Sequence, residues 1–329
     1  MIKIGLNNDT MKAIIKFGRG NEMKAARWHN ARDIRVEEVE EPKAGKGKVK
    51  IKVEWAGICG SDLHEYAAGP IFVPVQEPHP VSKDVAPIIM GHEFSGQVVE
   101  VGEGVTKVKV GDPVVVEPIL RCGECPACKK GKYNLCESLG FHGLSGGGGG
   151  FSEYTVVDEH MVHKMPEGLS YEQGALVEPA AVALHAVRLS KIKPGDKAAV
   201  FGTGPIGLLV IEALKAAGAS EIYAVEVSKE RLQKAKELGA TSVINPIEED
   251  PVQKLHELTD GGVDVAFEVT GIPAVLQQAI DSTAFEGETV IVSIWEKEAG
   301  IQPNNIVLKE RNGKGIIAYR DIFPAVMEL

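Results

Sequence analysis

The sequence is short of basic residues and contains no long hydrophobic run. Lysine and arginine number 36 against 46 aspartate and glutamate residues, and the formal net charge is −10. A chain of this charge has no electrostatic attraction to nucleic acid or to an anionic membrane. No stretch approaches the ~18–20 unbroken apolar residues of a membrane span, and the N-terminus lacks the apolar core of a signal peptide. These absences predict a soluble, cytoplasmic protein.

Composition and length are those of a folded protein with more than one domain. The hydrophobic share of 44 % and the charged share of 25 % are ordinary globular values. At ~150 residues per domain, 329 residues correspond to about two domains. The first half, to about Tyr171, is rich in glycine and proline, and residues 48–54 and 96–101 have the pattern of strands. The glycine run 146–150 predicts a flexible loop that carries no packing.

The second half changes character, because strand-like runs alternate with helical patterns. Helices are predicted at 207–217 and 229–238. Six strands with intervening helices indicate a parallel, doubly wound sheet, and thus an α/β domain beside a β-rich one. The predicted strands are 197–201, 221–227, 241–244, 263–269, 288–294 and 314–318.

Cysteine is scarce, with five residues, but four of them are clustered. Their order is Cys122-x2-Cys125-x2-Cys128-x7-Cys136, and two-residue spacers let one loop surround a single ion with four thiolates. A structural zinc site is therefore predicted. A disulfide is disfavoured in a reducing cytosol, whereas spacing alone does not exclude an iron–sulfur cluster.

The segment Gly202-Thr-Gly204-Pro-Ile-Gly207 matches the G-x-G-x-x-G pattern between a predicted strand and a predicted helix. Gly202 permits a tight turn, Gly204 lets a pyrophosphate approach the backbone, and Gly207 lets the helix pack close to the strand. Pro205 and Ile206 complete the loop at the helix N-terminus, whose N–H groups and positive dipole end face the phosphates. The pattern predicts dinucleotide binding.

Glu226 follows Gly207 by 19 residues, at the end of the second strand of this domain. An acid there accepts both ribose hydroxyls and repels a 2′-phosphate, which favours NAD over NADP; the alternative is a solvated charge at a strand end. Arg231 either flanks the adenine or is a plain helix-surface residue. Ligands bind at the carboxyl ends of parallel strands. Three further candidates stand at such ends: Thr270, Gly271 and Ser293.

A second metal site is suggested by Cys59, His92 and Glu178. One thiolate, one imidazole and one carboxylate can hold zinc while a fourth position stays open to water or substrate. From the residues alone, Cys59 is also explained as a small buried hydrophobe. Glu178, before a proline, is also explained as a carboxylate at a helix start.

Taken together, these motifs resemble the zinc-dependent medium-chain dehydrogenase/reductase family, over nearly everything from Met23 onward. Glu178, in Val177-Glu-Pro179, places the resemblance in the polyol branch of that family. The segment 63–71 is similar to that of the dehydrogenases which act on (R,R)-2,3-butanediol. The other matching motifs, in family order, are Gly91-His-Glu-x2-Gly96-x5-Gly102-x2-Val105, the four-cysteine lobe, Gly149-Gly-Phe-Ser-Glu-Tyr154 and Gly204-Pro-Ile-Gly207.

The resemblance implies a GroES-like catalytic domain joined to a Rossmann NAD-binding domain. It implies one catalytic zinc on Cys59, His92 and Glu178, and one structural zinc on the four cysteines. Glu93 is either a zinc ligand in one state or a group that orients His92. Ser61 would take the hydroxyl proton and His64 would pass it toward solvent; the plain alternatives are a turn residue and a surface histidine.

The activity implied is reversible oxidation of (R,R)-2,3-butanediol to acetoin with NAD, with diacetyl as a further oxidation product. The alternatives are an L-threonine or sorbitol (polyol) dehydrogenase of the same branch and, ranked lower, a non-catalytic NAD-binding relative. The loop 69–91 is expected to line the substrate cleft and to discriminate among these substrates. The partner is a small alcohol, diol or hydroxyketone.

The predicted domains are 23–175 for zinc binding and catalysis and 176–320 for NAD. The family start aligns with Met23, so residues 1–22 are expected to form an extension. Residues 321–329 have the pattern of the first helical turns of a C-terminal segment, which is expected to be truncated, with reduced stability or turnover. A homo-oligomer, dimer or tetramer, is expected through the stretch 286–299.

Overall fold

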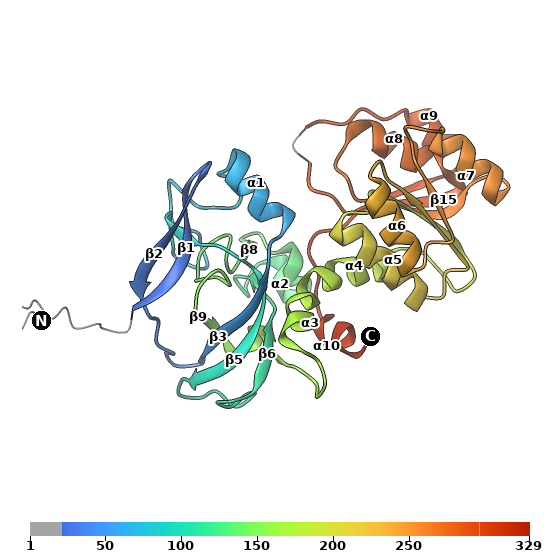
Figure 1. Cartoon of the computed structure of the whole chain (residues 1–329). Helices are drawn as coiled ribbons and strands as arrows, with labels where there is room; N and C mark the ends of the chain where they lie inside the picture. The colour runs from blue at the N-terminus through green and yellow to red at the C-terminus, as the bar shows by residue number, and fades with distance from the viewer. Residues whose placement is uncertain (1–21, 296) are drawn as a thin grey trace, which may run out of the picture. The chain divides into compact units, whose positions relative to one another are not determined.

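The computed structural model describes residues 22–295 and 297–329, which fold into two compact units (Figure 1). Residues 22–114 and 140–164 form the first unit, and 115–139 with 165–329 form the second. Apart from Glu22, the predicted N-terminal extension lies outside the described residues. Within the described part of the chain, every helix is too short or too polar to cross a lipid bilayer.

The first unit is rich in strands, as predicted, and these strands pair in antiparallel fashion. One sheet has the order β2-β1-β4, and the other has the order β10-β6-β5-β3-β9. In β3 the side chains of Val49 and Ile51 are fully buried. The strands are β1 (Glu22–Asn30), β2 (Asp33–Glu40), β3 (Lys48–Gly57), β4 (Ile88–Ile89), β5 (Glu93–Val101), β6 (Pro113–Val116), β8 (Gly140–Phe141), β9 (Tyr154–Asp158) and β10 (Val162–Lys164).

The glycine run 146–150 does carry packing, so that part of the prediction is wrong. A Cβ on Gly149 would lie 2.3 Å from the carbonyl oxygen of Met90, and one on Gly150 would lie 2.7 Å from the ring of Phe94. Both glycines are buried. The backbone of the run itself fills this space. A side chain there would push the loop away from β5, the strand that carries Phe94.

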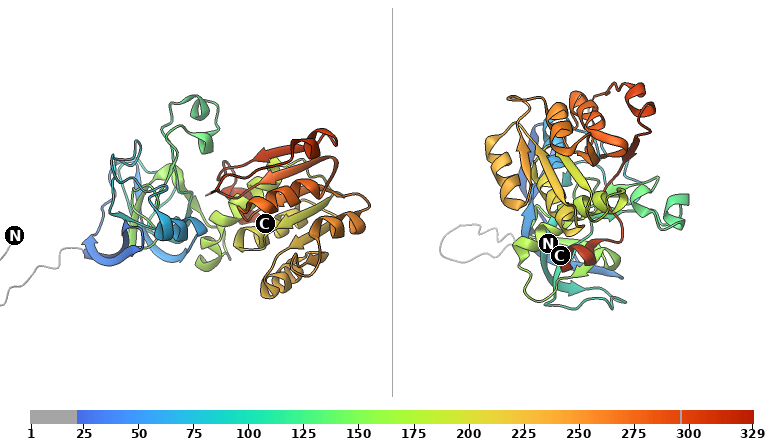
Figure 2. Two further views of the ribbon diagram at one scale, coloured as in Figure 1. Left: turned by 90° about the horizontal axis from the view of Figure 1, so that it is seen from above. Right: turned by 90° about the vertical axis from the view of Figure 1, so that its right-hand side faces the viewer.

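The second unit is a Rossmann-type doubly wound domain, as predicted. Its six parallel strands have the order β13-β12-β11-β14-β15-β16, and helices cover both faces (Figure 2). Because both faces are covered, the central strands are continuous apolar runs; residues 198–201, for example, are fully buried. The strands are β11 (Lys197–Phe201), β12 (Glu221–Val225), β13 (Ser242–Ile244), β14 (Val263–Glu268), β15 (Thr283–Ile291) and β16 (Asn312–Gly315), with β7 (Ile119–Leu120) also in this unit.

The last two strands begin earlier than predicted, at Thr283 and Asn312. Gly287 and the positive φ of Glu286 interrupt the first of them, and glycine weakens a strand pattern. The helices of the described residues are α1 (Gly60–Ala68) in the first unit, and in the second α2 (Pro126–Lys129), α3 (Tyr171–Ala175), α4 (Val177–Leu189), α5 (Pro205–Ala216), α6 (Lys229–Leu238), α7 (Pro251–Thr259), α8 (Pro273–Asp281), α9 (Pro303–Val307) and α10 (Phe323–Glu328). Short 3-10 turns lie at Tyr133–Leu135 and Glu159–Met161.

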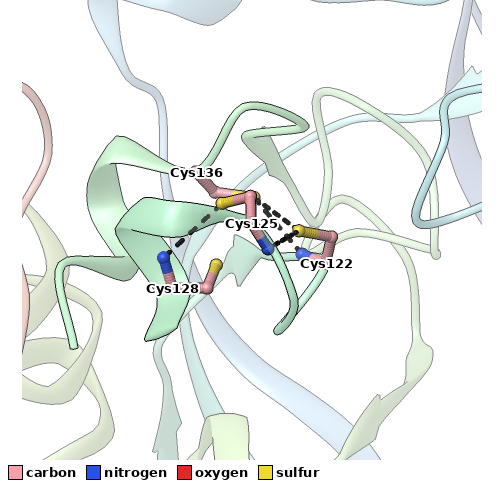
Figure 3. Close-up of side chains that lie close together, drawn as sticks. All are labelled: Cys122, Cys125, Cys128 and Cys136. Carbon is pink, nitrogen blue, oxygen red and sulfur yellow. Dashed lines mark hydrogen bonds between the residues drawn. The ribbon is translucent and has the colours of Figure 1, made fainter. Parts of the chain in front are cut away.

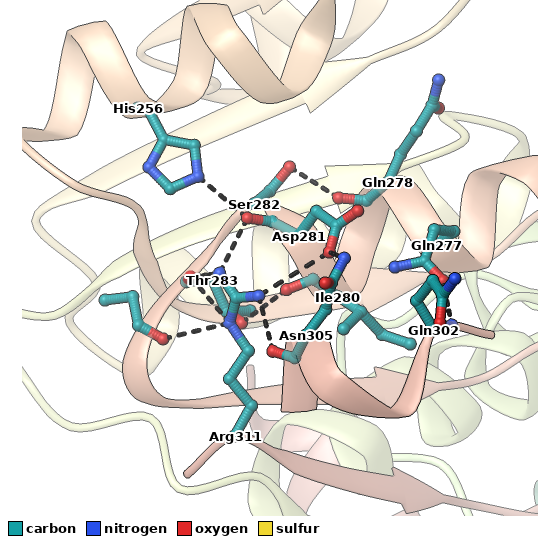
Figure 4. A network of polar contacts seen from close by, with 11 residues as sticks. His256, Gln277, Gln278, Ile280, Asp281, Ser282, Thr283, Gln302, Asn305 and Arg311 are labelled. Carbon is teal, nitrogen blue, oxygen red and sulfur yellow. Dashed lines mark hydrogen bonds and ion pairs between the residues drawn. The ribbon is translucent and has the colours of Figure 1, made fainter. Parts of the chain in front are cut away.

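Arg311 anchors the start of β15 (Figure 4). Its buried guanidinium donates hydrogen bonds to the backbone carbonyls of Asp281, Thr283 and Asn305. It also pairs with the Asp281 carboxylate at 3.7 Å. A guanidinium offers five donors in a fixed plane, so one side chain joins the end of α8, the start of β15 and α9.

Candidate functional site

Three of the predicted metal ligands lie together in the first unit. Cys59 stands just after β3, and His92 and Glu93 stand at the start of β5, which pairs with β3 so that Gly57 faces Glu93. One ligand atom from each of Cys59, His92 and Glu93 lies within 4.8 Å of the others. Gly57 makes room for this arrangement, since a Cβ there would lie 2.4 Å from Glu93 Oε2. Burial raises the pKa of Glu93.

Asp62 belongs to this cluster and was missed in the sequence. It is buried, its Oδ1 lies 3.5 Å from His92 Nδ1, and its Oδ2 accepts a hydrogen bond from Cys59 N–H at 3.0 Å. A carboxylate behind a metal-ligating histidine fixes the ring and its tautomer. With Asp62 beside Nδ1, Nε2 is the nitrogen left for a metal, and a thiolate, an imidazole and a carboxylate form a donor set that fits zinc. The available signal was the spacing of Asp62, three residues after Cys59, which is typical of a helix first turn.

Ser61 and His64 both lie on α1, one turn apart. Ser61 Oγ is 3.4 Å from His92 Nε2, so its hydroxyl is beside the candidate metal position. His64 is exposed. Residues three apart on a helix share a face, and the proton path from Ser61 to His64 stays a prediction.

The loop that follows α1 is held by Glu65, a second acid missed in the sequence. Its side chain is fully buried, and it accepts hydrogen bonds from the backbone N–H groups of Ile71, Phe72 and Val73. The ring of Phe72 meets that of Phe141 edge to face at 5.9 Å. One carboxylate therefore organises the first residues of the segment 69–91.

The remaining predicted ligand, Glu178, lies in the second unit, in the first turn of α4. It is buried, and its Oε1 accepts a hydrogen bond from the Tyr319 hydroxyl at 2.6 Å. Burial and the neighbouring Glu178 carboxylate raise the pKa of Tyr319 well above its usual range, so the hydroxyl stays a donor. Tyr319 was not identified in the sequence, because 141 residues separate it from Glu178.

The four clustered cysteines converge on one point in the second unit (Figure 3). The Sγ atoms of Cys122 and Cys136 are 3.5 Å apart, and those of Cys125 and Cys136 are 4.0 Å apart. Four thiolates at about 2.3 Å from one zinc ion in a tetrahedron are separated by about 3.8 Å. The backbone N–H groups of Cys128 and Glu137 lower the pKa of Cys125, whereas burial raises the pKa values of Cys128 and Cys136.

The sulfur separations also decide between the alternatives for these cysteines. A disulfide requires about 2.05 Å, and all five cysteines of the chain are free. The four ligand atoms lie within 4.8 Å of one another, which suits one shared ion. A cluster in which each thiolate binds a different iron needs a wider arrangement. The geometry favours zinc.

The glycine loop has the local geometry that dinucleotide binding requires. Gly202 has a φ of +90°, a Cβ on Gly207 would lie 1.9 Å from the carbonyl oxygen of Gly202, and a Cβ on Gly204 would meet nothing within 4 Å. Gly202 thus makes the turn, Gly207 allows the close helix approach, and Gly204 borders open space. Pro205 and Ile206 form the first turn of α5, with Gly204 as its N-cap.

Glu226 lies at the end of β12 and holds the glycine loop from the side. Its Oε2 accepts a hydrogen bond from Thr203 N–H at 3.0 Å and lies 3.8 Å from Arg231 Nη1. Its Oε1 accepts from Val227 N–H at 2.8 Å. The carboxylate is therefore fixed beside the loop, where the ribose was predicted, and the ribose role itself stays a prediction.

A buried acid, Glu268, gathers the three cofactor candidates that follow β14 and β15. Its Oε1 accepts hydrogen bonds from Thr270 N–H at 2.7 Å and from Gly271 N–H at 3.0 Å. Its Oε2 accepts from the Ser293 hydroxyl. Glu268 is fully buried. It was missed because it reads in the sequence as part of a strand.

Comparison with known proteins agrees with this geometry. Residues 45–167 match the family model of the alcohol dehydrogenase GroES-like domain, and residues 205–329 match that of the zinc-binding dehydrogenases. The chain is 68 % identical to the (R,R)-butanediol dehydrogenase of Bacillus subtilis, over 93 % of this chain and 88 % of that protein. It is 40 % identical to a sorbitol dehydrogenase of the same organism, over 93 % and 85 %.

Among solved structures, the chain is similar to the crystal structure of 2R,3R-butanediol dehydrogenase from Bacillus subtilis. The TM-score is 0.88, with 68 % identity and coverage of 93 % of this chain and 87 % of that one. The family expected from the motifs is thereby confirmed, as are the GroES-like and Rossmann folds. The chain belongs to the zinc-binding alcohol dehydrogenases of the medium-chain dehydrogenase/reductase family.

Proposed function

We propose that this chain catalyses the reversible, NAD-dependent oxidation of (R,R)-2,3-butanediol to acetoin. The observation that carries the proposal is the 68 % identity over 93 % of the chain. It is supported by the cluster of Cys59, His92 and Glu93, whose ligand atoms lie within 4.8 Å of one another. Diacetyl is the product of a further oxidation.

In this proposal Cys59, His92 and Glu178 hold a catalytic zinc, and the four clustered cysteines hold a structural one. When bound, zinc supplies Lewis acidity toward the substrate oxygen and NAD supplies the hydride acceptor. Asp62 orients His92 through Nδ1. The Ser61 hydroxyl, beside His92 Nε2, takes the hydroxyl proton of the diol, and His64 passes it to solvent. Glu93 stays close enough to replace another ligand.

Purified, zinc-loaded protein is expected to reduce acetoin with NADH and to oxidise (R,R)-2,3-butanediol with NAD. Zinc analysis should give two ions per chain, since two separate donor sets are present. The measurement is initial rate against concentration for acetoin, L-threonine and sorbitol under one set of conditions. A preference for threonine or sorbitol by a wide margin would reject the butanediol assignment.

Cofactor choice is expected to depend on Glu226. Removing its negative charge in Glu226→Gln removes the repulsion of a 2′-phosphate while keeping an acceptor for Thr203 N–H. The NAD preference, measured as the ratio of kcat/KM for NADH and NADPH, should fall about tenfold, equal to about 1.4 kcal/mol. Glu226→Ala should weaken the NAD preference as well. Its thermal melt measures how much stability is lost with the hydrogen bond from Thr203 N–H. An unchanged ratio in both variants would remove Glu226 from the ribose site.

We further infer that the protein is a cytoplasmic homo-oligomer, either a dimer or a tetramer. The four free, clustered thiols suit a reducing compartment. The last strand, β16, is at the edge of the six-stranded sheet, and Ile294 within the stretch 286–299 is 48 % exposed. An edge strand leaves backbone N–H and C=O groups with which a second copy of the chain can pair.

A further inference from the structure

The four-cysteine lobe, residues 122–136, has a second set of contacts that metal binding does not explain. Two polar side chains of its 3-10 turn, Tyr133 and Asn134, are buried. Both reach the segment 317–321, more than 180 positions further along the chain.

The contacts enclose Tyr319 from both sides. Asn134 Nδ2 donates to the carbonyl oxygen of Ile317 at 2.9 Å, and Asn134 Oδ1 accepts from Arg320 Nη1 at 2.9 Å. On the far side, the Tyr133 hydroxyl accepts from Asp321 N–H at 2.6 Å. Two side chains of the lobe thus hold the backbone two residues before and two residues after Tyr319.

The Tyr133 hydroxyl is itself held. It donates to Glu117 Oε1 at 2.7 Å, and the guanidinium of Arg121 stacks on the ring at 4.2 Å. The acceptor lone pair that Asp321 N–H uses is therefore presented in a fixed direction. A hydroxyl oriented by a charged acceptor makes a stronger and more directional link than a free one.

The segment 317–321 contains two residues with strained backbone conformations, which need contacts from the surrounding structure to persist. Ala318 and Asp321 have φ angles of +45° and +51°, in the left-handed region that non-glycine residues avoid. Such residues persist where surrounding contacts over-determine them, and they cluster at functional sites. Here the contacts come from the lobe, and the residue between the two strained positions that points inward is Tyr319.

Tyr319 links the segment 317–321 to Glu178. Its side chain is fully buried, its ring packs on Phe323 with 5.3 Å between centroids, and its hydroxyl donates to Glu178 Oε1 at 2.6 Å. A metal-ligating carboxylate is commonly held in this way by a hydrogen bond from a neighbouring side chain.

We propose that the four-cysteine lobe is a positioning element for Glu178, acting through Tyr133 and Asn134 on the segment 317–321 and through Tyr319 on the carboxylate. This inference rests on the proposed role of Glu178 as a ligand of the catalytic zinc. It assigns the lobe a function in the active site in addition to a structural one.

The test uses the zinc-loaded protein and measures release of zinc to a chelator over time, with a thermal melt of each variant. Cys59→Ser, which lacks the catalytic site, identifies the release phase that belongs to the lobe. The variants are Tyr319→Phe, Tyr133→Phe and the double variant. Tyr223→Phe is the matched control, because Tyr223 is also buried and hydrogen-bonded to a glutamate, Glu221, on a remote strand.

Both single variants should release the catalytic zinc about 10-fold faster than the wild type while retaining the lobe zinc, since outer hydrogen-bond partners are worth 10–100-fold in metal affinity. The double variant should be no faster than Tyr319→Phe, because the lobe acts through Tyr319. Tyr223→Phe should match the wild type. If Tyr133→Phe fails to fold, Asn134→Ala takes its place.

Rapid release in Tyr319→Phe with wild-type release in the folded lobe variant would overturn the proposal, because packing on Phe323 would then suffice to hold Tyr319. Additive effects in the double variant would overturn it too. Zinc release does not require turnover, so the butanediol activity and the positioning role of the lobe can each be rejected without the other. A wild type that binds two zinc ions and does not reduce acetoin refutes the butanediol activity, and unchanged release in an active enzyme refutes the positioning role.

Discussion

Replacing Cys59 by serine is expected to remove one of two zinc ions and lower kcat/KM for acetoin about 1,000-fold. Cys59, His92 and Glu93 present their ligand atoms within 4.8 Å of one another, and a serine hydroxyl is a poor substitute for a thiolate on zinc. A bound Lewis acid contributes several kcal/mol to the transition state, and each 1.36 kcal/mol is tenfold in rate. Metal analysis and steady-state kinetics measure the two effects.

The reciprocal variant, Cys128→Ser, provides the control. It should lose the other zinc ion, because Cys128 is one of the four thiols that converge in the lobe. Its main effect should be on the thermal melt, since structural zinc contributes directly to folding free energy. A Cys59→Ser protein that keeps both zinc ions and full activity would show that Cys59 is not a zinc ligand.

Two substitutions in the glycine loop are expected to separate folding from NAD binding, one lowering stability and the other lowering affinity. In Gly207→Ala, the new Cβ would lie 1.9 Å from the carbonyl oxygen of Gly202, a backbone atom that cannot move away alone. The helix α5 must then shift, which should lower the free energy of unfolding by about 3 kcal/mol. Urea denaturation measures this loss.

In Gly204→Ala, the new Cβ meets nothing within 4 Å, so the fold should remain. NAD affinity should fall at least about tenfold, equal to about 1.4 kcal/mol, because the methyl group occupies the side from which the pyrophosphate approaches. Titration of NADH fluorescence measures the affinity. Gly313→Ala is the matched control, since it too has open space around the Cβ, and it should change neither quantity. Unimpaired NADH binding by Gly204→Ala would place the pyrophosphate elsewhere.

Features with a short spacing could be predicted from the sequence. The four cysteines, the glycine loop and the alternation of strands and helices each depend on residues near one another in the chain. Their local geometry follows from the chemistry of the residues: the φ of +90° at Gly202 is one that glycine adopts without strain. The strand 197–201 and the helix 229–238 have the predicted bounds because apolar periodicity is clear there.

Features that depend on distant contacts could not be predicted in the same way. The glycine run 146–150 looked like an empty loop, because the atoms of Met90 and Phe94 that leave no room for a side chain come from another segment. Asp62 and Glu268 were not identified as site residues from the sequence. Only their burial, with partners such as His92 and Ser293, identifies them as parts of the site.

The sequence by itself determined the family, the two fold types and the kinds of side chain proposed to bind metal and NAD, because these follow from residue type and local spacing. The tertiary structure decided which buried polar groups support them. A buried carboxylate must find hydrogen-bond donors, and those donors are chosen by packing rather than by sequence distance. Tyr319 reaches Glu178 across 141 residues, and Tyr133 and Asn134 fix the backbone on either side of it. No local pattern encodes that arrangement, since it exists only once the chain has folded.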